Sequence, residues 1–137
     1  MNSRIFIDSN IWLYAKLDTA DIIKSERARN CLLNVGEAII SNQVLAEVGC
    51  NLVKKAKLDE FRVRLHLLDL LDACELVSIN RDIVLAASHL RSNGTLSYWD
   101  SLIIAAALES GCSELWSEDL QAGRVFEGRL HIINPLT

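Results

Sequence analysis

Proline and glycine are scarce in this sequence, which has one proline and six glycines in 137 residues. Because these residues mark linkers and irregular segments, the chain has little room for long unstructured connections. Half of the residues are hydrophobic, which excludes a disordered chain. A chain of this length can bury a substantial core, so we expect a single domain over residues 1–137.

Long apolar runs are also lacking. The longest covers residues 102–108, whereas a membrane-spanning helix needs about 20 apolar residues. Asp8 interrupts the short apolar run at the N-terminus, which argues against a secretory signal. The four cysteines form no C-x-x-C pair and have no histidine at metal-ligand spacing. We therefore expect a cytoplasmic protein with reduced cysteines and no membrane association.

Basic residues are outnumbered by acidic ones, 14 to 18, which gives a net charge of −4. Nucleic-acid-binding domains usually carry a basic footprint, so this total argues against such a ligand. Acidic residues that bind divalent cations would lose their net charge, however, and local basic residues could then contact phosphate. One candidate RNA-contacting rim is Lys54, Lys55, Lys57, Arg62 and Arg64, and another is Arg124 with Arg129. Ordinary solvated helix faces are the alternative explanation.

Short apolar segments alternate with segments of helical periodicity along the whole chain. Buried strands are predicted over residues 4–7, 38–40, 76–79, 114–116 and 131–133. Helices are predicted over about 11–17, 21–35, 41–55, 58–73, 82–92 and 98–109. Ser9 and Asn10 are expected to cap the first helix, and Gly36 to end the second. This pattern predicts an α/β fold, a three-layer α/β/α sandwich with a short, mainly parallel central sheet.

Two regions carry more apolar surface than a core-facing stripe needs. Helix 58–73 is expected to place Phe61, Leu65, Leu68 and Leu71 on one face, widened by Val63, Leu67 and Leu70. A second surface is expected around Trp12 and Tyr14. Both predict association with other chains, including a homodimer. Core packing is the favoured prediction for Trp99, with stacking on a nucleobase as the alternative.

Four acidic residues occupy positions that a parallel sheet would bring to one edge. Asp8 and Asp119 follow predicted strands, while Glu47 and Asp100 lie near the starts of helices that neighbour strands. Ligands of open parallel sheets bind beyond the carboxyl ends of the strands. Hard cations prefer oxygen ligands, and no histidine or cysteine lies near these positions, which favours Mg²⁺ or Mn²⁺ over Zn²⁺. The sequence therefore predicts a carboxylate-lined metal site formed by Asp8, Glu47, Asp100 and Asp119.

Each carboxylate also has a structural explanation. Asp8 could cap the following helix, and Asp100 could complete a capping box with Ser97. Glu47 could be a solvated residue at the flank of its helix. Asp119 could be a loop residue, and Glu118 is a competing carboxylate in the same loop.

Taken together, four segments resemble the PIN-domain family, and within it the VapC-type ribonuclease toxins of prokaryotic toxin–antitoxin pairs. They are FIDSNIWLY (6–14), SNQVLAEV (41–48), SYWDSLIIAAA (97–107) and GCSELWSEDL (111–120). The resemblance implies an endoribonuclease that hydrolyses RNA with metal-activated water, with Mg²⁺ or Mn²⁺ bound by the four acidic residues. It also implies supporting polar roles for Asn10 and Ser117, and an antitoxin protein as partner. Residues 54–96 match only in helical pattern, so no RNA target is implied.

Four rival functions fit parts of the same pattern. A haloacid-dehalogenase-type phosphatase needs a second aspartate two residues after the first, where this chain has Asn10. A DNA-directed flap nuclease usually carries additional helical elements, for which 137 residues leave little room. A PIN-like scaffold that binds RNA or protein without cleavage would not need intact acidic positions. An RNA-processing nuclease outside a toxin–antitoxin pair is a fourth alternative.

Overall fold

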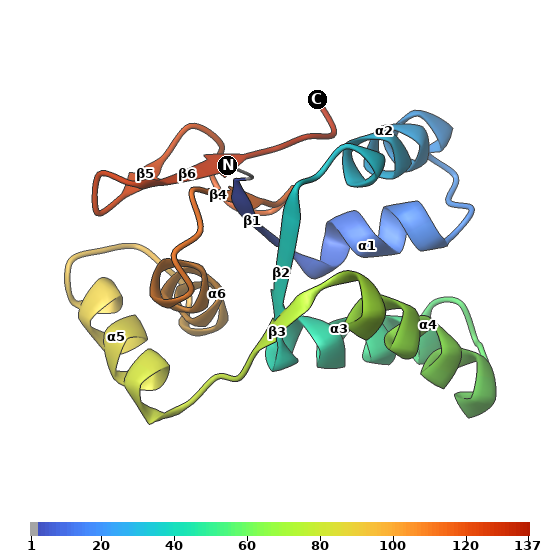
Figure 1. The fold of residues 1–137 in the computed structure, drawn as a ribbon, viewed down its shortest axis with the longest axis horizontal. Helices are drawn as coiled ribbons and strands as arrows, with labels where there is room; N and C mark the ends of the chain where they lie inside the picture. Colours follow the sequence, from blue (N-terminus) through green and yellow to red (C-terminus); the bar gives the residue numbers. More distant parts are fainter. Residues whose placement is uncertain (1–2) are drawn as a thin grey trace.

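A computed structural model of the protein describes residues 3–137, in which one six-stranded sheet is flanked by helices (Figure 1). The strands are β1 (Arg4–Ile7), β2 (Glu37–Ser41), β3 (Glu75–Val77), β4 (Glu114–Trp116), β5 (Val125–Phe126) and β6 (Leu130–Ile133). The helices are α1 (Ser9–Lys16), α2 (Ile22–Leu33), α3 (Asn42–Lys54), α4 (Glu60–Ala73), α5 (Arg81–Ser92) and α6 (Tyr98–Glu109).

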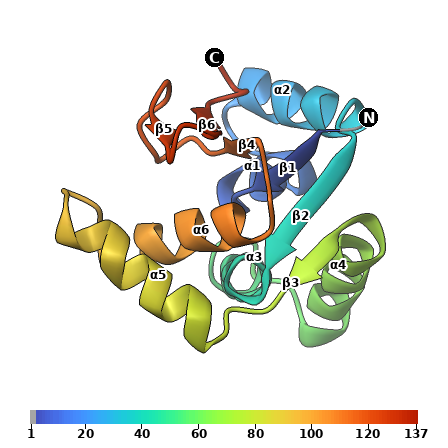
Figure 2. The ribbon, with the colours of Figure 1, turned by 60° about the vertical axis from the view of Figure 1, so that its left-hand side comes forward.

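The sheet has the strand order β3-β2-β1-β4-β6-β5, and every neighbouring pair except β5–β6 is parallel. The chain moves outward from β1 to β2 and β3, and then returns past β1 to β4. Because parallel crossovers are right-handed, this reversal places α1–α4 on one face and α5 and α6 on the other. Figures 1 and 2 show these two helical layers around the sheet. The predicted α/β/α architecture is therefore confirmed.

The most buried helix is α6, in which all residues from 101 to 108 are buried. It contacts both β2 and β4 and also packs against α5. Ala105, Ala106 and Ala107 are completely buried. Small side chains at these positions let the helix approach its neighbours closely, which fixes the position of its first turn relative to the sheet.

The β5–β6 hairpin was missed by the sequence prediction. Strand β5 has only two residues, and its turn lacks the Asn-Gly or Asp-Gly pair that signals a tight hairpin. Glu127 and Gly128 both have positive φ, 52° and 65°, and the Arg129 N–H donates to the Phe126 carbonyl at 3.1 Å. Positive φ at both central residues and this hydrogen bond are features of a primed turn, although three residues, 127–129, separate the paired Phe126 and Leu130.

Three predicted element ends are wrong by a few residues. Helix α1 is capped by Asp8, whose Oδ1 accepts from the Ser9 N–H at 2.8 Å, rather than by Ser9 or Asn10. Helix α2 ends before Gly36, with Asn34 as its C-cap. Strand β3 ends at Val77, because the Ile79 N–H donates to the Asn42 side chain at 2.9 Å instead of to a neighbouring strand.

The apolar surfaces differ from the prediction in two places. Trp12 lies in the core, so the expected association surface around it is wrong. Trp99 is exposed, so its predicted core packing is also wrong.

Helix α4 buries Val63 and Leu70, while its other predicted apolar face is exposed: Phe61, Leu65, Leu68 and Leu71. The helix packs mainly on α3, which covers only one stripe of its surface.

No helix within residues 3–137 is long and apolar enough to cross a membrane. The four cysteines are free thiols. Burial raises the pKa of Cys31 and of Cys74 to about 11, so these thiols are poor nucleophiles at neutral pH.

Because α6 packs against the sheet, we expect truncation of one of its buried side chains to cost much more stability than truncation of an exposed side chain of similar size. Ile104→Ala removes a buried side chain and should lower the free energy of unfolding by about 2–5 kcal/mol. Leu33→Ala, at a position that is 81% exposed, should change it by less than about 0.5 kcal/mol. Urea unfolding of both variants measures the difference, and equal losses would contradict this description of the core.

Candidate active site

Asp8 lies where the strand order reverses, between the carboxyl ends of β1 and β4. Its N–H donates to the Trp116 carbonyl at 2.9 Å, and its Oδ2 accepts from Ser117 Oγ at 2.8 Å. Both bonds join the residue after β1 to the end of β4. In open α/β sheets this reversal opens a crevice in which ligands bind. Local sequence and topology therefore place the Asp8 carboxylate at the expected ligand site.

Ser117 and Asn10 position the loop that carries Asp119. Ser117 is completely buried, and its Oγ accepts from the N–H groups of Asp119 at 3.1 Å and Leu120 at 3.4 Å. Asn10 Nδ2 donates to Asp119 Oδ2 at 3.0 Å, and Asn10 Oδ1 accepts from the Glu118 N–H at 3.2 Å. These are the contacts that the predicted supporting roles of Asn10 and Ser117 require.

Glu47 is linked to the same network by two residues that the sequence prediction missed. Ser9 Oγ donates to Glu47 Oε2 at 2.8 Å, and Gln43 Nε2 donates to Glu47 Oε1 at 3.0 Å. Gln43 also reaches the Trp99 carbonyl at 3.4 Å, which connects α3 to the first turn of α6. The spacing of Gln43 and Glu47, four residues apart on one helix, was the available signal.

Asp100 lies in the first turn of α6, where Ser97 Oγ accepts from its N–H at 3.1 Å. Within residues 3–137 its carboxylate accepts no hydrogen bond, so the reciprocal half of a capping box is not formed. The side chain instead lines a hollow of about 160 Å³ together with Asp119 and Arg124. The structure therefore brings Asp100 and Asp119 to one hollow, although Asp100 does not join the hydrogen-bonded network of the other three carboxylates.

Glu118 has different partners from Asp119. It accepts from the Tyr14 hydroxyl at 2.9 Å and forms an ion pair with Lys24, whose ammonium lies 5.6 Å from the centre of the Tyr14 ring. The Lys24 charge neutralises this carboxylate locally. Asp119 is therefore the better candidate for a cation ligand from this loop.

Asp8 is only 8% exposed, and it is the one buried carboxylate of the four. The pKa of its carboxyl is raised to about 6, chiefly by burial and in smaller part by the negative charges of Glu47 and Asp119, while the hydrogen bonds from Ser117 and Ser9 lower it. A cation bound between these groups would favour the ionised carboxylate. The predicted cation would therefore offset the negative charge that gathers around Asp8.

The oxygen-only donor set fits Mg²⁺ or Mn²⁺. In residues 3–137, no three His, Cys, Asp or Glu side chains are already arranged around one point as a metal cluster. Three of the four carboxylates, those of Asp8, Glu47 and Asp119, are instead held by Ser9, Asn10, Gln43 and Ser117. The metal roles of Asp8, Glu47, Asp100 and Asp119 stay predictions.

The basic residues divide into those beside the site and those away from it. Lys55 lines a hollow of about 440 Å³ with Asn10 and Asp119, and Arg124 lines the hollow of Asp100. The other rim residues are exposed and line neither hollow: Lys54, Lys57, Arg62 and Arg64. Arg129 is engaged elsewhere, with the Leu108 carbonyl and Glu127.

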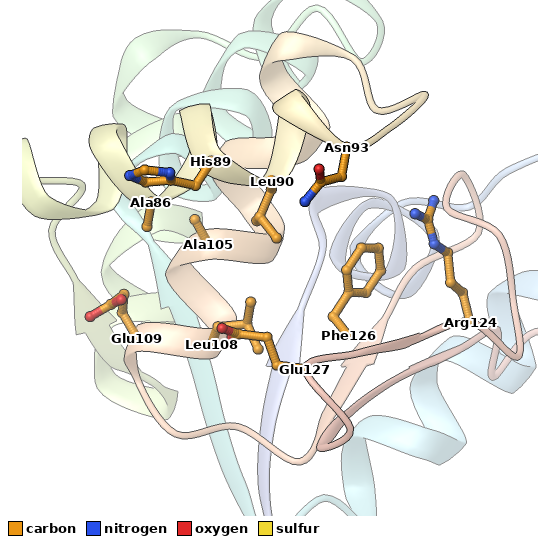
Figure 3. A pocket seen from close by; sticks show the side chains of 10 residues that line it. All are labelled: Ala86, His89, Leu90, Asn93, Ala105, Leu108, Glu109, Arg124, Phe126 and Glu127. Atoms are coloured by element: carbon orange, nitrogen blue, oxygen red, sulfur yellow. The ribbon is translucent and has the colours of Figure 1, made fainter.

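A larger hollow of about 530 Å³ adjoins the site between α5, α6 and the β5–β6 hairpin (Figure 3). It shares Arg124 and Phe126 with the hollow of Asp100. The Arg124 guanidinium carbon lies 4.5 Å from the centre of the Phe126 ring. Within residues 3–137 Arg124 forms no ion pair, so its charge can interact with a ligand.

Comparison with known proteins identifies the family. The family model described as the PIN domain matches residues 5–126. The chain belongs to the PIN-domain family. The match includes every predicted site residue of this PIN domain, from Asp8 to Asp119. No curated protein matches the sequence significantly.

Several solved structures share the fold of this PIN domain. A toxin–antitoxin complex from Klebsiella pneumoniae superposes with a TM-score of 0.72 at 21% identity, covering 96% of this chain and 97% of the other. FitAcB from Neisseria gonorrhoeae gives 0.72 at 16% identity, with coverage of 96% and 97%. The sarcin-ricin-loop-cleaving toxin VapC20 of Mycobacterium tuberculosis gives 0.68 at 16% identity, with coverage of 84% and 91%.

The buried charge of Asp8 predicts an unusual pH dependence for Asp8→Asn in metal-free buffer. The pKa of Asp8 is about 6 in the folded protein and ordinarily 3.8, so ionisation of Asp8 opposes folding. The parent protein loses stability from this group as the pH rises from about 4 to about 6, by at most about 3 kcal/mol. Thermal melts should therefore show Asp8→Asn gaining stability relative to the parent between pH 4 and pH 7.5.

Asp72→Asn is the matched control, because it removes an exposed carboxylate of α4 outside the site network, where no cost of burial is involved. A stability difference between Asp8→Asn and the parent that stays the same at pH 4 and pH 7.5 would contradict the account. Such a result would show that the lost Ser117 hydrogen bond, rather than the buried charge, dominates.

Proposed function

We propose that this PIN domain is a Mg²⁺-dependent endoribonuclease and the toxin of a toxin–antitoxin pair. The observation that carries the proposal lies at the reversal of the sheet: Asp8, Glu47 and Asp119 share one hydrogen-bonded network there, and Asp100 shares a hollow with Asp119. An all-carboxylate site suits phosphoryl transfer, in which divalent cations neutralise developing charge.

Asp8, Glu47, Asp100 and Asp119 would hold Mg²⁺, with Mn²⁺ as a substitute. When bound, the ion supplies Lewis acidity toward the phosphate and lowers the pKa of water. Ser117 and Ser9 orient the Asp8 carboxylate, and Asn10 orients that of Asp119. Arg124, at the edge of the same hollow, would compensate phosphate charge that the acidic protein otherwise repels.

The structural neighbours support the toxin–antitoxin context, because their names describe a toxin–antitoxin complex and a toxin that cleaves the sarcin-ricin loop. An antitoxin protein is the proposed partner, in the cytoplasm. The exposed apolar side chains of α4 support association with other chains, including a homodimer. An RNA-processing role outside such a pair would use the same site.

Ribonuclease activity is tested by incubating purified protein, freed of any antitoxin, with an RNA stem-loop, single-stranded DNA and a phosphomonoester. We expect cleavage of RNA alone, in Mg²⁺ or Mn²⁺ and not in chelator. Asp8→Asn and Asp100→Asn should each lower the rate by about 100-fold or more, since even indirect partners of metal ligands are worth 10- to 100-fold.

Glu118→Gln is the control, because Lys24 and Tyr14 occupy this neighbouring carboxylate. It should cleave RNA at nearly the parent rate. Intact RNA in Mg²⁺, or equal activity of the parent and both aspartate variants, would sink the ribonuclease proposal. Hydrolysis of the phosphomonoester would favour a phosphatase instead.

We expect Arg124 and the basic residues of α4 to contribute differently to RNA affinity. Arg124→Gln should weaken RNA binding and reduce the slope of log affinity against log salt by about one, because Arg124 lies in the site hollow. Arg64→Gln removes the same charge from an exposed position outside the site hollows and should have a smaller effect. Filter binding across a salt series measures both slopes, and a larger effect of Arg64→Gln would place the RNA path over α4.

A further inference from the structure

Two aromatic rings are exposed beside the candidate site, at the first turn of α6. Trp99 is 64% exposed and Tyr98 is 49% exposed. Their ring centres lie 5.2 Å apart with an interplanar angle of 73°. Large aromatic side chains normally bury most of their surface, so a pair left in solvent is a strong indication of a ligand or partner.

The backbone beneath these rings is held by the candidate site itself. The Trp99 carbonyl accepts from Gln43, which also donates to Glu47. The next residue is Asp100, which lines the hollow of Asp119. The indole therefore projects from a fixed point one residue away from a carboxylate of the site.

Arg91 supports the pair and adds positive charge. Its guanidinium carbon lies 4.2 Å from the centre of the Tyr98 ring, and its Nη1 donates to Ser101 Oγ at 2.8 Å. Ser101 Oγ in turn donates to the Tyr98 carbonyl. Within residues 3–137 Arg91 has no carboxylate partner in an ion pair. The Arg91 guanidinium thus packs against the Tyr98 ring and can also attract phosphate.

We propose that Trp99 and Tyr98 form a stacking platform for an unpaired nucleobase of RNA, next to the phosphate that the carboxylate site cleaves. The inference rests on the proposed ribonuclease function and adds a substrate class, RNA with an unpaired base at the cleavage site. Exposed rings with an adjacent unpaired cation are the combination by which proteins hold single-stranded nucleic acid. A duplex keeps its bases stacked inside and could not use this platform.

A second copy of the chain is the competing occupant of the rings. The exposed apolar side chains of α4 already offer a surface for such a partner: Phe61, Leu65, Leu68 and Leu71. The Trp99 surface is small, carries Arg91, and is tied by hydrogen bonds to the candidate site. These features favour a nucleotide over a protein partner.

The test measures binding of a fluorescently labelled RNA hairpin with an unpaired loop, in Mg²⁺, to protein carrying Asp8→Asn so that cleavage is suppressed. Trp99→Leu keeps an apolar side chain but removes the ring, and should weaken binding by about 5- to 150-fold. Trp99→Tyr restores a ring and should recover most of the affinity. Phe61→Leu is the matched control, since Phe61 is also 64% exposed, and should bind as the Asp8→Asn protein does.

Unchanged affinity in Trp99→Leu, or equal losses in Trp99→Leu and Trp99→Tyr, would overturn the platform. Sedimentation of the same proteins tests whether a second copy of the chain binds the rings instead. Loss of both self-association and RNA affinity in Trp99→Leu would show that the rings contact a second copy. If the proposed nuclease function is wrong but the platform is right, the parent protein would bind the hairpin in a Trp99-dependent way and leave it uncut. That result would support the platform and reject the nuclease.

Discussion

The site depends on one hydrogen bond, from Ser117 Oγ to Asp8 Oδ2, across the point where the sheet reverses direction. The bond joins the end of β1 to the end of β4 and holds a buried carboxylate at the only reversal in the parallel part of the sheet within residues 3–137. Ser117 also accepts from two backbone N–H groups of the next loop. One hydroxyl thus fixes Asp8 and the start of the Asp119 loop together.

A buried carboxylate opposes folding unless hydrogen bonds or a cation stabilise its charge. Here the hydrogen bonds of Asp8 only partly offset burial, and its pKa stays raised to about 6. The adjacent charges of Glu47 and Asp119 act in the same direction. Under the proposed function, a divalent cation bound at the crevice would stabilise the ionised Asp8 carboxylate and offset this cost.

Much of the fold was predictable because its signals are local. The apolar runs of β1 and β2 and the apolar segment 102–108 of α6 reflect burial on every side. Strand β5 (residues 125–126) was not predictable, since two residues carry no periodicity and a Glu-Gly turn is a weak hairpin signal. The exposed face of α4 could not be distinguished from its buried face, because both are apolar and only the position of α3 decides between them.

The site was predictable to the level of residue positions but not of contacts. Strand ends and helix starts indicated that Asp8, Glu47, Asp100 and Asp119 share one edge. Ser9 and Gln43 gave little sign of their role, since each acts through a side-chain contact set by tertiary packing. The exposure of Trp99 was likewise hidden, because a tryptophan at the start of an apolar helix normally signals core.

The central claim is that the strained carboxylates bind a divalent cation, and calorimetric titration of metal-free protein with Mn²⁺ tests it most directly. Titrations in buffers of different ionisation enthalpy report the protons released on binding. With an Asp8 pKa of about 6, binding should be saturable and release about half a proton at pH 6 and almost none at pH 8. The absence of saturable binding, or the same proton release at both pH values, would contradict the account.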